Sequence, residues 1–171
     1  MPDRNHAVAL LHEWVENEGL RRHMYAVEAA VRFYARKMGA DEELWGLAGL
    51  LHDLDWEKSP DVHPMKGVEA LEEAGYPEEV IHAVLAHRPE YTGWNTETEL
   101  DRVLRAGHEI SGFIHDASLM PPNGIDDVTP KTVVKKLKEE AFAAGVDWEQ
   151  VARMRDAAEI PGIKGMDLQT E

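Results

Sequence analysis

The sequence predicts an all-α protein, a single-domain bundle of about seven to eight helices. Apolar residues recur mostly at helical spacing, Gly or Pro separates the apolar segments, and no segment shows the strict alternation of a half-buried strand. A chain of 171 residues is long enough for one hydrophobic core and short for two. We expect one domain over residues 1–160, followed by a loosely held tail over residues 161–171, which contains glycine and is weakly apolar.

Local signals place the individual helices. Gly19 and Gly39 follow the first two apolar segments, where glycine readily ends a helix. Asp41 is a candidate N-cap before "EELWGLAGLL", and Pro77 precedes two glutamates that suit a first turn. The segment "MPPNGIDDVTP" contains two prolines and Asn-Gly, which predicts a surface loop. The expected helices are 6–18, 20–38, 42–53, 64–74, 78–88, 97–117, 131–143 and 148–158.

Composition and charge restrict the classes of partner. With 33 acidic and 18 basic side chains, the formal charge of −15 repels long nucleic acids and acidic membrane surfaces. A small anionic substrate can still bind where a cation in a pocket makes the local electrostatic potential positive. The sequence has no apolar run long enough for a membrane span and no secretory signal pattern, so we expect a cytoplasmic protein. The oligomeric state stays open.

Zero cysteines exclude thiolate ligands, so any metal must be held by His, Asp, Glu or water. Of the nine histidines, three fall on apolar helix faces. At 100° per residue His87 lies on the side of Val80, whereas His82 points to the opposite side and is expected to face water. His23 begins an inward stripe of small apolar residues, and His52 follows a leucine-rich run.

Asp53 strengthens the case for a metal, because a buried carboxylate is costly unless a cation or strong donors compensate it. It follows His52 at the end of a helix, where neighbouring side chains need not diverge as they do within a helix. His63 precedes a proline at a helix start, and His108 lies on the same face as Leu104. Five histidines and one aspartate on five different helical segments therefore predict a metal site. His6, His12 and His115 are expected outside it, although His115 shares a helix face with His108.

The order His23, then His52-Asp53, is similar to the HD-domain superfamily of metal-dependent phosphohydrolases, which is named for that dipeptide. The segments "LRRHMYAVEAAVRFYARKMG", "ELWGLAGLLHDLDWEK", "HPMKGVEALEEAGYPEEVIHAVLAH" and "EISGFI" together resemble small, stand-alone hydrolases of the HDIG type. The resemblance extends from about residue 10 to about residue 145. It implies that the helical bundle is of the HD type.

The resemblance also implies a ligand set. His23, His52 and Asp53 would bind one metal together with a fourth ligand from a later helix. His63 and His87 are similar to residues that hold a second metal in binuclear members, and Asp53 would bridge the two ions with one oxygen on each.

One departure from the relatives affects the choice of metal. Where relatives read Asp-Glu-Leu-Thr-Gly-Phe-Ile, this chain reads "HEISGFI", so the fourth ligand is His108 in place of aspartate. The exchange moves the preference from Mg²⁺ or Mn²⁺ toward Fe²⁺, Ni²⁺, Co²⁺ or Zn²⁺. We expect one or two divalent transition-metal ions, drawn from Fe, Mn, Ni, Co or Zn.

The expected activity is metal-dependent hydrolysis of a nucleotide or another small phosphate ester. Asp53 and Lys66 are the candidate catalytic residues, and Arg22 and Lys66 are candidate contacts for the phosphate. Asp55 and Glu57 are candidates for an acid or for a base that acts through a metal ligand. Two alternatives stay open. One is an HD-type oxygenase with two irons. The other is a metal- or ligand-binding protein without catalysis, which is suggested by His108 in place of the usual aspartate.

Overall fold

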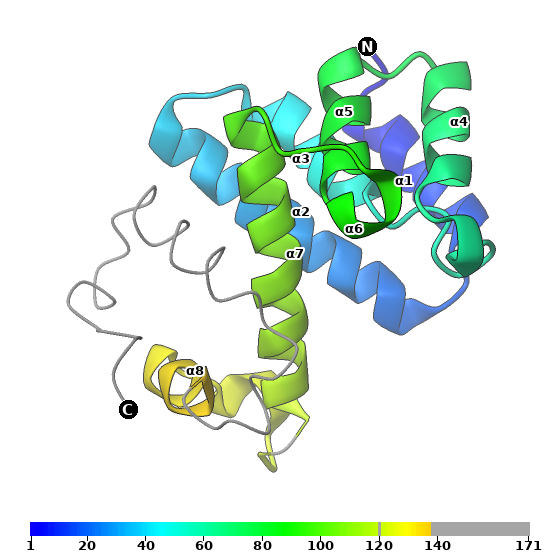
Figure 1. Ribbon diagram of the computed structural model, residues 1–171. Coiled ribbons are helices and arrows are strands. Elements are labelled where there is room, and N and C mark those ends of the chain that lie inside the picture. Colours follow the sequence, from blue (N-terminus) through cyan, green and yellow to red (C-terminus); the bar gives the residue numbers. More distant parts are fainter. Residues whose placement is uncertain (120, 138–171) are drawn as a thin grey trace.

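The computed structural model describes residues 1–119 and 121–137, and this part of the chain is built from helices joined by turns (Figure 1). It contains eight α-helices, two short 3₁₀ helices and no strand, which confirms the all-α prediction. The elements are α1 (Arg4–Trp14), α2 (Glu18–Met38), α3 (Glu42–Leu51), η1 (Pro60–Val62), α4 (Met65–Glu73), α5 (Glu78–Ala86), α6 (Pro89–Thr92), α7 (Glu99–Ser118), η2 (Gly124–Asp127) and α8 (Pro130–Leu137).

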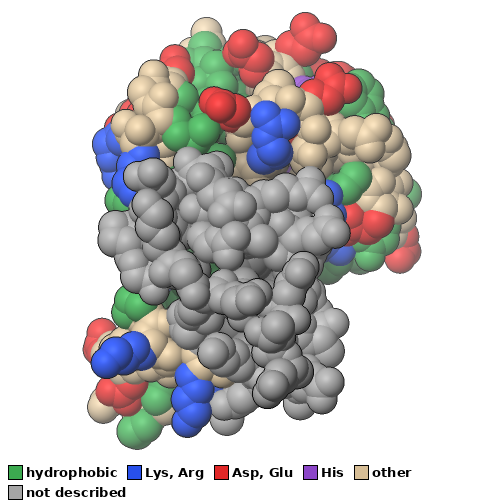
Figure 2. Space-filling model, turned by 60° about the vertical axis from the view of Figure 1, so that its left-hand side comes forward, with side chains coloured by type: hydrophobic (Ala, Val, Ile, Leu, Met, Phe, Trp, Pro, Cys, Tyr) green, Lys and Arg blue, Asp and Glu red, His purple; other side chains and the backbone are tan. Residues whose placement is uncertain are grey.

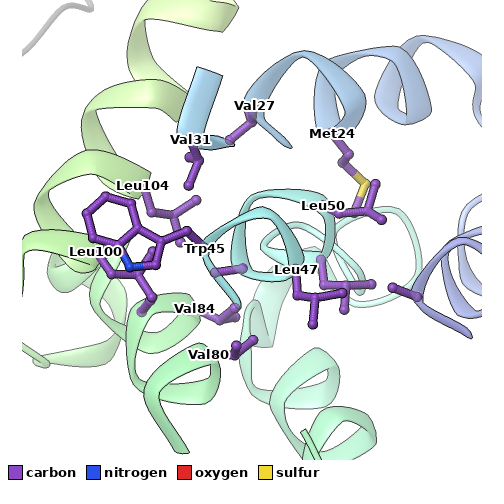
Figure 3. Packing of buried hydrophobic residues seen from close by; sticks show 14 of the residues in the cluster. Met24, Val27, Val31, Trp45, Leu47, Leu50, Val80, Val84, Leu100 and Leu104 are labelled. Carbon is purple, nitrogen blue, oxygen red and sulfur yellow. The ribbon is translucent and has the colours of Figure 1, made fainter. Parts of the chain in front are cut away.

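Helix α3 lies at the centre of the bundle. Every residue from Trp45 to Leu51 is buried, as expected for a helix that is apolar on all sides. Helices α1, α2, α5 and α7 pack against it. Figure 3 shows the resulting core, in which side chains of α2, α3, α5 and α7 turn toward one another. Because α3 is enclosed in this way, its C-terminal residues arrive in the interior of the protein.

Helices α2 and α3 approach each other closely at Gly49. A Cβ atom added to Gly49 would lie 2.9 Å from Cα of Glu28 and 3.2 Å from the carbonyl oxygen of Val27, so only glycine leaves room for the α2 backbone. Glu28 itself is buried and accepts hydrogen bonds from Arg4 and Arg32. This crossing sets how α2 lies relative to the end of α3.

Helix α7, with 20 residues, connects the two ends of the bundle. Helices α1 to α6 gather around one end of α7, and α8 lies at the other end (Figure 1). Acidic side chains are dispersed among basic and apolar ones on the face that Figure 2 shows. Across the described ranges, no helix is both long enough and apolar enough to cross a bilayer.

The first helix boundary was predicted wrongly. Asn17 caps α2 by accepting a hydrogen bond from the backbone N–H of Leu20, so Gly19 lies in the first turn of α2 and does not end α1. The side-chain cap at Asn17 starts α2 before Gly19, and glycine in the first turn of a helix lowers its stability only slightly.

Helix α6 was not predicted. The end of the expected helix 131–143, the helix 148–158 and the tail 161–171 lie outside the described residues, so the domain range 1–160 stays a prediction.

Candidate metal centre

His52 and Asp53 lie directly after α3, where the chain coils through successive turns. His52 keeps helical dihedral angles (φ −60°, ψ −34°), and the backbone N–H of Trp56 then donates to the carbonyl of Asp53 at 3.1 Å. Both side chains are buried, His52 with 0% and Asp53 with 5% of its surface exposed. The helix end thus directs two neighbouring side chains into one interior space, as the sequence interpretation required.

A first group of possible ligands consists of His23, His52, Asp53 and His108, from α2, the end of α3 and α7. One nitrogen or oxygen atom of each lies within 4.8 Å of the others. Nδ1 of His108 is 3.1 Å from Nε2 of His52 and 3.3 Å from Nε2 of His23. Oδ2 of Asp53 is 3.3 Å from Nε2 of His52 and 3.7 Å from Nε2 of His23.

A second group consists of Asp53, His63 and His87, all buried. Oδ1 of Asp53 lies 3.4 Å from Nε2 of His63 and 3.4 Å from Nε2 of His87, and these two nitrogens are 3.3 Å apart. Asp53 therefore turns one carboxylate oxygen toward each group. The structure brings together all six residues that the sequence predicted as ligands.

Hydrogen bonds outside the groups determine which nitrogen of three rings faces Asp53. Nδ1 of His52 lies 2.8 Å from the carbonyl oxygen of Gly49, and Nδ1 of His87 lies 2.5 Å from that of Val84. Nδ1 of His63 lies 2.6 Å from Oδ1 of Asp55. Carbonyl and carboxylate oxygens only accept hydrogen bonds, so each Nδ1 carries a proton.

A neutral ring protonated at Nδ1 presents a lone pair at Nε2, so the lone pairs of His52, His63 and His87 point at the Asp53 carboxylate. When these rings are neutral, electron pairs on nitrogen and oxygen thus converge at 3.3 to 3.4 Å. A cation placed among them removes this repulsion. The donor set therefore fits a divalent metal.

The ionisation states agree with that fit. Burial lowers the pKa of His23 to about 4 and that of His108 to about 2, and the charge of His52 acts in the same direction. Burial also lowers the pKa of His87. Burial alone would raise the pKa of Asp53, but His52 and His87 outweigh it and hold that pKa well below its usual range. At neutral pH His23, His87 and His108 are therefore neutral imidazoles and Asp53 is a carboxylate, the forms that bind metals.

The other candidate residues have different surroundings. Lys66 and Arg22 are exposed, and each pairs with a carboxylate of its own helix. Lys66 lies 2.6 Å from Glu69, and Arg22 lies 3.5 Å from Glu18. Their proposed contact with phosphate stays a prediction.

Asp55 and Glu57 were candidates for an acid or base. Asp55 is fully buried and accepts from His63 and from the backbone N–H of Gly67 at 2.9 Å, so it orients a ring of the second group. Glu57 accepts the backbone N–H groups of Glu16 and Asn17, both at 2.9 Å. That contact ties the loop between α1 and α2 to the turns after α3.

The histidines expected outside the site are not among the two groups. Nδ1 of His6 lies 3.0 Å from the hydroxyl of Tyr76, and Nε2 of His12 lies 3.1 Å from that of Tyr25. His115 is exposed and lines a cavity of about 510 Å³ that His23 and Trp56 also line.

The expectation that His82 faces water was wrong. Its side chain is only 20% exposed, and Nδ1 lies 3.1 Å from Oδ2 of Asp101. Asp101 belongs to α7, so the partner comes from another helix and the periodicity of α5 could not reveal it.

Two residues beside the centre were missed by the sequence reasoning, Arg88 and Trp56. Nη1 of Arg88 lies 3.5 Å from Nε2 of His108, and the guanidinium lies over the rings of Tyr91 and Trp56. Trp56 is 39% exposed and its ring meets that of His63 edge to face at 5.1 Å. Their positions next to predicted ligands in the sequence could have indicated them, because Arg88 directly follows His87 and Trp56 closely follows His52-Asp53.

Comparison with known proteins agrees with this arrangement. A family model of the HD domain matches residues 20–107, just over half of the 171-residue chain. The match includes His23, His52, Asp53, His63 and His87 and ends one residue before His108. No curated protein and no solved structure matches the chain significantly. On the family match, the chain belongs to the HD-domain family.

Proposed function

We propose that the protein is a metal-dependent phosphohydrolase that acts on a nucleotide or another small phosphate ester. Membership of the HD-domain family supports metal-dependent hydrolase chemistry in general. The single observation that carries the proposal is the convergence of imidazole lone pairs on the two oxygens of Asp53. A cation among these six residues would explain how polar groups with so few donors share one buried space.

In this proposal the first group, His23, His52, Asp53 and His108, would hold one divalent ion. The second group, Asp53, His63 and His87, would hold another. A set of five imidazoles and one carboxylate favours Fe, Co, Ni or Zn over Mg²⁺, which prefers oxygen. When bound, such an ion supplies a Lewis acid that lowers the pKa of water and polarises a phosphoryl oxygen.

The protein residues provide position and protonation state. Asp55 keeps the proton of His63 on Nδ1, and the carbonyls of Gly49 and Val84 do the same for His52 and His87. Asp53 remains an anion at neutral pH, so it can connect the two groups. This arrangement holds the ligands in one geometry before a substrate arrives, which is the main requirement for phosphoryl transfer.

The cavity lined by His23, Trp56 and His115 meets the first group at His23, which supports entry of a substrate from this side. Its volume of about 510 Å³ is within the usual range for small-molecule sites. Trp56 offers a partly exposed indole face on which a flat group such as a nucleobase can stack. These features support a small ester in preference to a polymer.

The test combines metal analysis with an activity panel. The chain is purified without a His-tag, its metals are quantified, and nucleotides and other phosphate esters are assayed with Mn²⁺, Fe²⁺, Co²⁺, Ni²⁺ and Zn²⁺. We expect hydrolysis by the wild type, loss of at least 100-fold in Asp53→Asn, and no change in His12→Ala, whose side chain bonds to Tyr25. Two irons with oxygen consumption and no hydrolysis would instead indicate an oxygenase, and bound metal without any turnover a binding protein.

A further inference from the structure

Arg88 lies beside the first group in a held conformation. Its side chain is 22% exposed, and the guanidinium lies 4.8 Å from the ring centre of Tyr91 and 5.8 Å from that of Trp56. Nε lies 2.8 Å from Oε1 of Glu90. Two aromatic rings and a carboxylate thus restrict the planar group, so little side-chain entropy remains to be lost on binding a ligand.

The contact between Arg88 and His108 depends on which nitrogen of His108 carries the proton. Nη1 of Arg88 is 3.5 Å from Nε2 of His108, while Nδ1 of the same ring faces His23 and His52. Arginine has donors and no acceptor, so the contact is a hydrogen bond only when Nε2 is unprotonated. In the metal-free protein the ring can satisfy this condition with its proton on Nδ1.

Metal binding reverses that condition. Nδ1 of His108 is the atom that points into the first group, and a neutral imidazole that binds a metal through Nδ1 carries its proton on Nε2. Nε2–H of His108 and the Nη–H groups of Arg88 then converge as donors with no acceptor between them. An oxygen of an anion can accept from both, and it would lie beside the first group.

The charge balance favours an anion at that point. The two groups contain one carboxylate, Asp53, and the second carboxylate nearby, Asp55, is engaged with His63 and Gly67. Glu90 occupies the Nε side of Arg88, which leaves the Nη groups for a ligand. A planar fork of this kind matches the oxygens of a phosphoryl group.

We propose that Arg88 and the Nε2–H of His108 form a binding site for a substrate phosphoryl oxygen, which becomes available when the first group binds its metal. The inference rests on the proposed function for the presence of metal and specifies how the substrate is held. It assigns the positively charged contact to Arg88, a residue in contact with the centre. Arg22 and Lys66, which pair with carboxylates of their own helices, are not needed for it.

The test is calorimetric titration of inorganic phosphate into the full chain, with and without bound Zn²⁺. The variants are Arg88→Gln and Arg88→Lys, and the matched control is Arg36→Gln. Arg36 is exposed, pairs with Glu42 and lies 13 residues from His23 along α2, about 20 Å at 1.5 Å per residue. Metal content is measured for every sample.

We expect the Zn²⁺-loaded wild type and Arg36→Gln to bind phosphate equally and the metal-free protein to bind it at least tenfold more weakly. Arg88→Gln should raise the phosphate Kd about tenfold or more at unchanged Zn²⁺ content, and Arg88→Lys should restore part of the affinity. A Kd for both Arg88 variants within twofold of wild type, or no binding by the loaded wild type, would overturn the inference. Hydrolysis is scored separately, so a protein that binds phosphate through Arg88 but hydrolyses no ester disproves the proposed function alone.

Discussion

Asp55 accepts the Nδ1–H of His63 at 2.6 Å and thereby determines that Nε2 of His63 faces Asp53. The second oxygen of Asp55 accepts from the backbone N–H of Gly67 at 2.9 Å. Both oxygens of this fully buried carboxylate are therefore occupied by donors. An amide in the same place can accept with only one atom.

Asp55→Asn should weaken metal binding by the second group. The new NH₂ group must face either the Nδ1–H of His63 or the N–H of Gly67, which are donors, so the ring loses its orientation or its tautomer. Loss of such a partner typically costs 10- to 100-fold in metal affinity. Metal titration should show one weakened site of two, while Asp61→Asn, an exposed aspartate in η1, keeps both. Equal affinities in the two variants would show that Asp55 does not support the centre.

Substitutions of His108 should separate a ligand from an ordinary core histidine. His108→Asp should keep the first site and shift its preference toward Mn²⁺, because a carboxylate suits harder cations and adds a negative charge. His108→Ala should weaken the first site and leave His63 and His87 in place. Titration with Mn²⁺, Fe²⁺ and Zn²⁺ measures both effects, with His12→Ala as control. The same order and strength of affinities in all four proteins would remove His108 from the centre.

Removal of metal should destabilise the protein, because an ion bound only by the folded state stabilises that state by mass action. At a free ion concentration 100 times the Kd, one ion contributes about 2.7 kcal/mol. For a domain of this size that corresponds to a fall of roughly 5–10 °C in Tm on chelation. Calorimetry with and without chelator measures the shift. An unchanged Tm in a sample shown to be free of metal would mean that the ion does not contribute to the stability of the fold.

The metal-free protein should lose stability on acidification between about pH 6.5 and pH 4. An unfolded histidine has a pKa near 6.5, whereas burial lowers the pKa of His23 to about 4 in the folded protein. Within that window the unfolded chain binds more protons, so the free energy of unfolding falls as the pH falls. His23→Gln should flatten this dependence and His12→Gln should not. Urea denaturation in chelator at several pH values tests it, and parallel curves for wild type and His23→Gln would contradict it.

Gly49→Ala should destabilise the protein by about 1–3 kcal/mol, the usual cost of overpacking. The added methyl group would lie 2.9 Å from the Glu28 backbone, so α2 and α3 must separate. Gly107→Ala is the matched control on α7, because its methyl group meets only side chains of α2, at 3.5 Å or more. We expect that control to be neutral or stabilising by up to about 1 kcal/mol, since alanine favours helix more than glycine. Urea denaturation compares the two, and equal effects would refute the close crossing at Gly49.

The sequence by itself determined most of the helical elements, although not α6 or the end of α1, and the direction in which most of the ligands point. Periodicity placed His23 and His87 on apolar faces, and Asp41 does cap α3 by accepting from the N–H of Leu44 at 3.0 Å. The position of His52 and Asp53 at a helix end was also readable. These features depend on neighbours within a few positions along the chain, and that is the range over which helical spacing and capping carry information.

Only the tertiary structure decided which of these residues meet. His23 and His108 are 85 residues apart in the chain, and their nitrogens lie 3.3 Å apart because α2 and α7 both pack on α3. The pairing of His82 with Asp101 and the position of Arg88 beside His108 arise in the same way, between separate elements. Such contacts depend on the distance and angle at which helices pack, and these are set by close approaches such as that at Gly49, which periodicity along one helix does not encode.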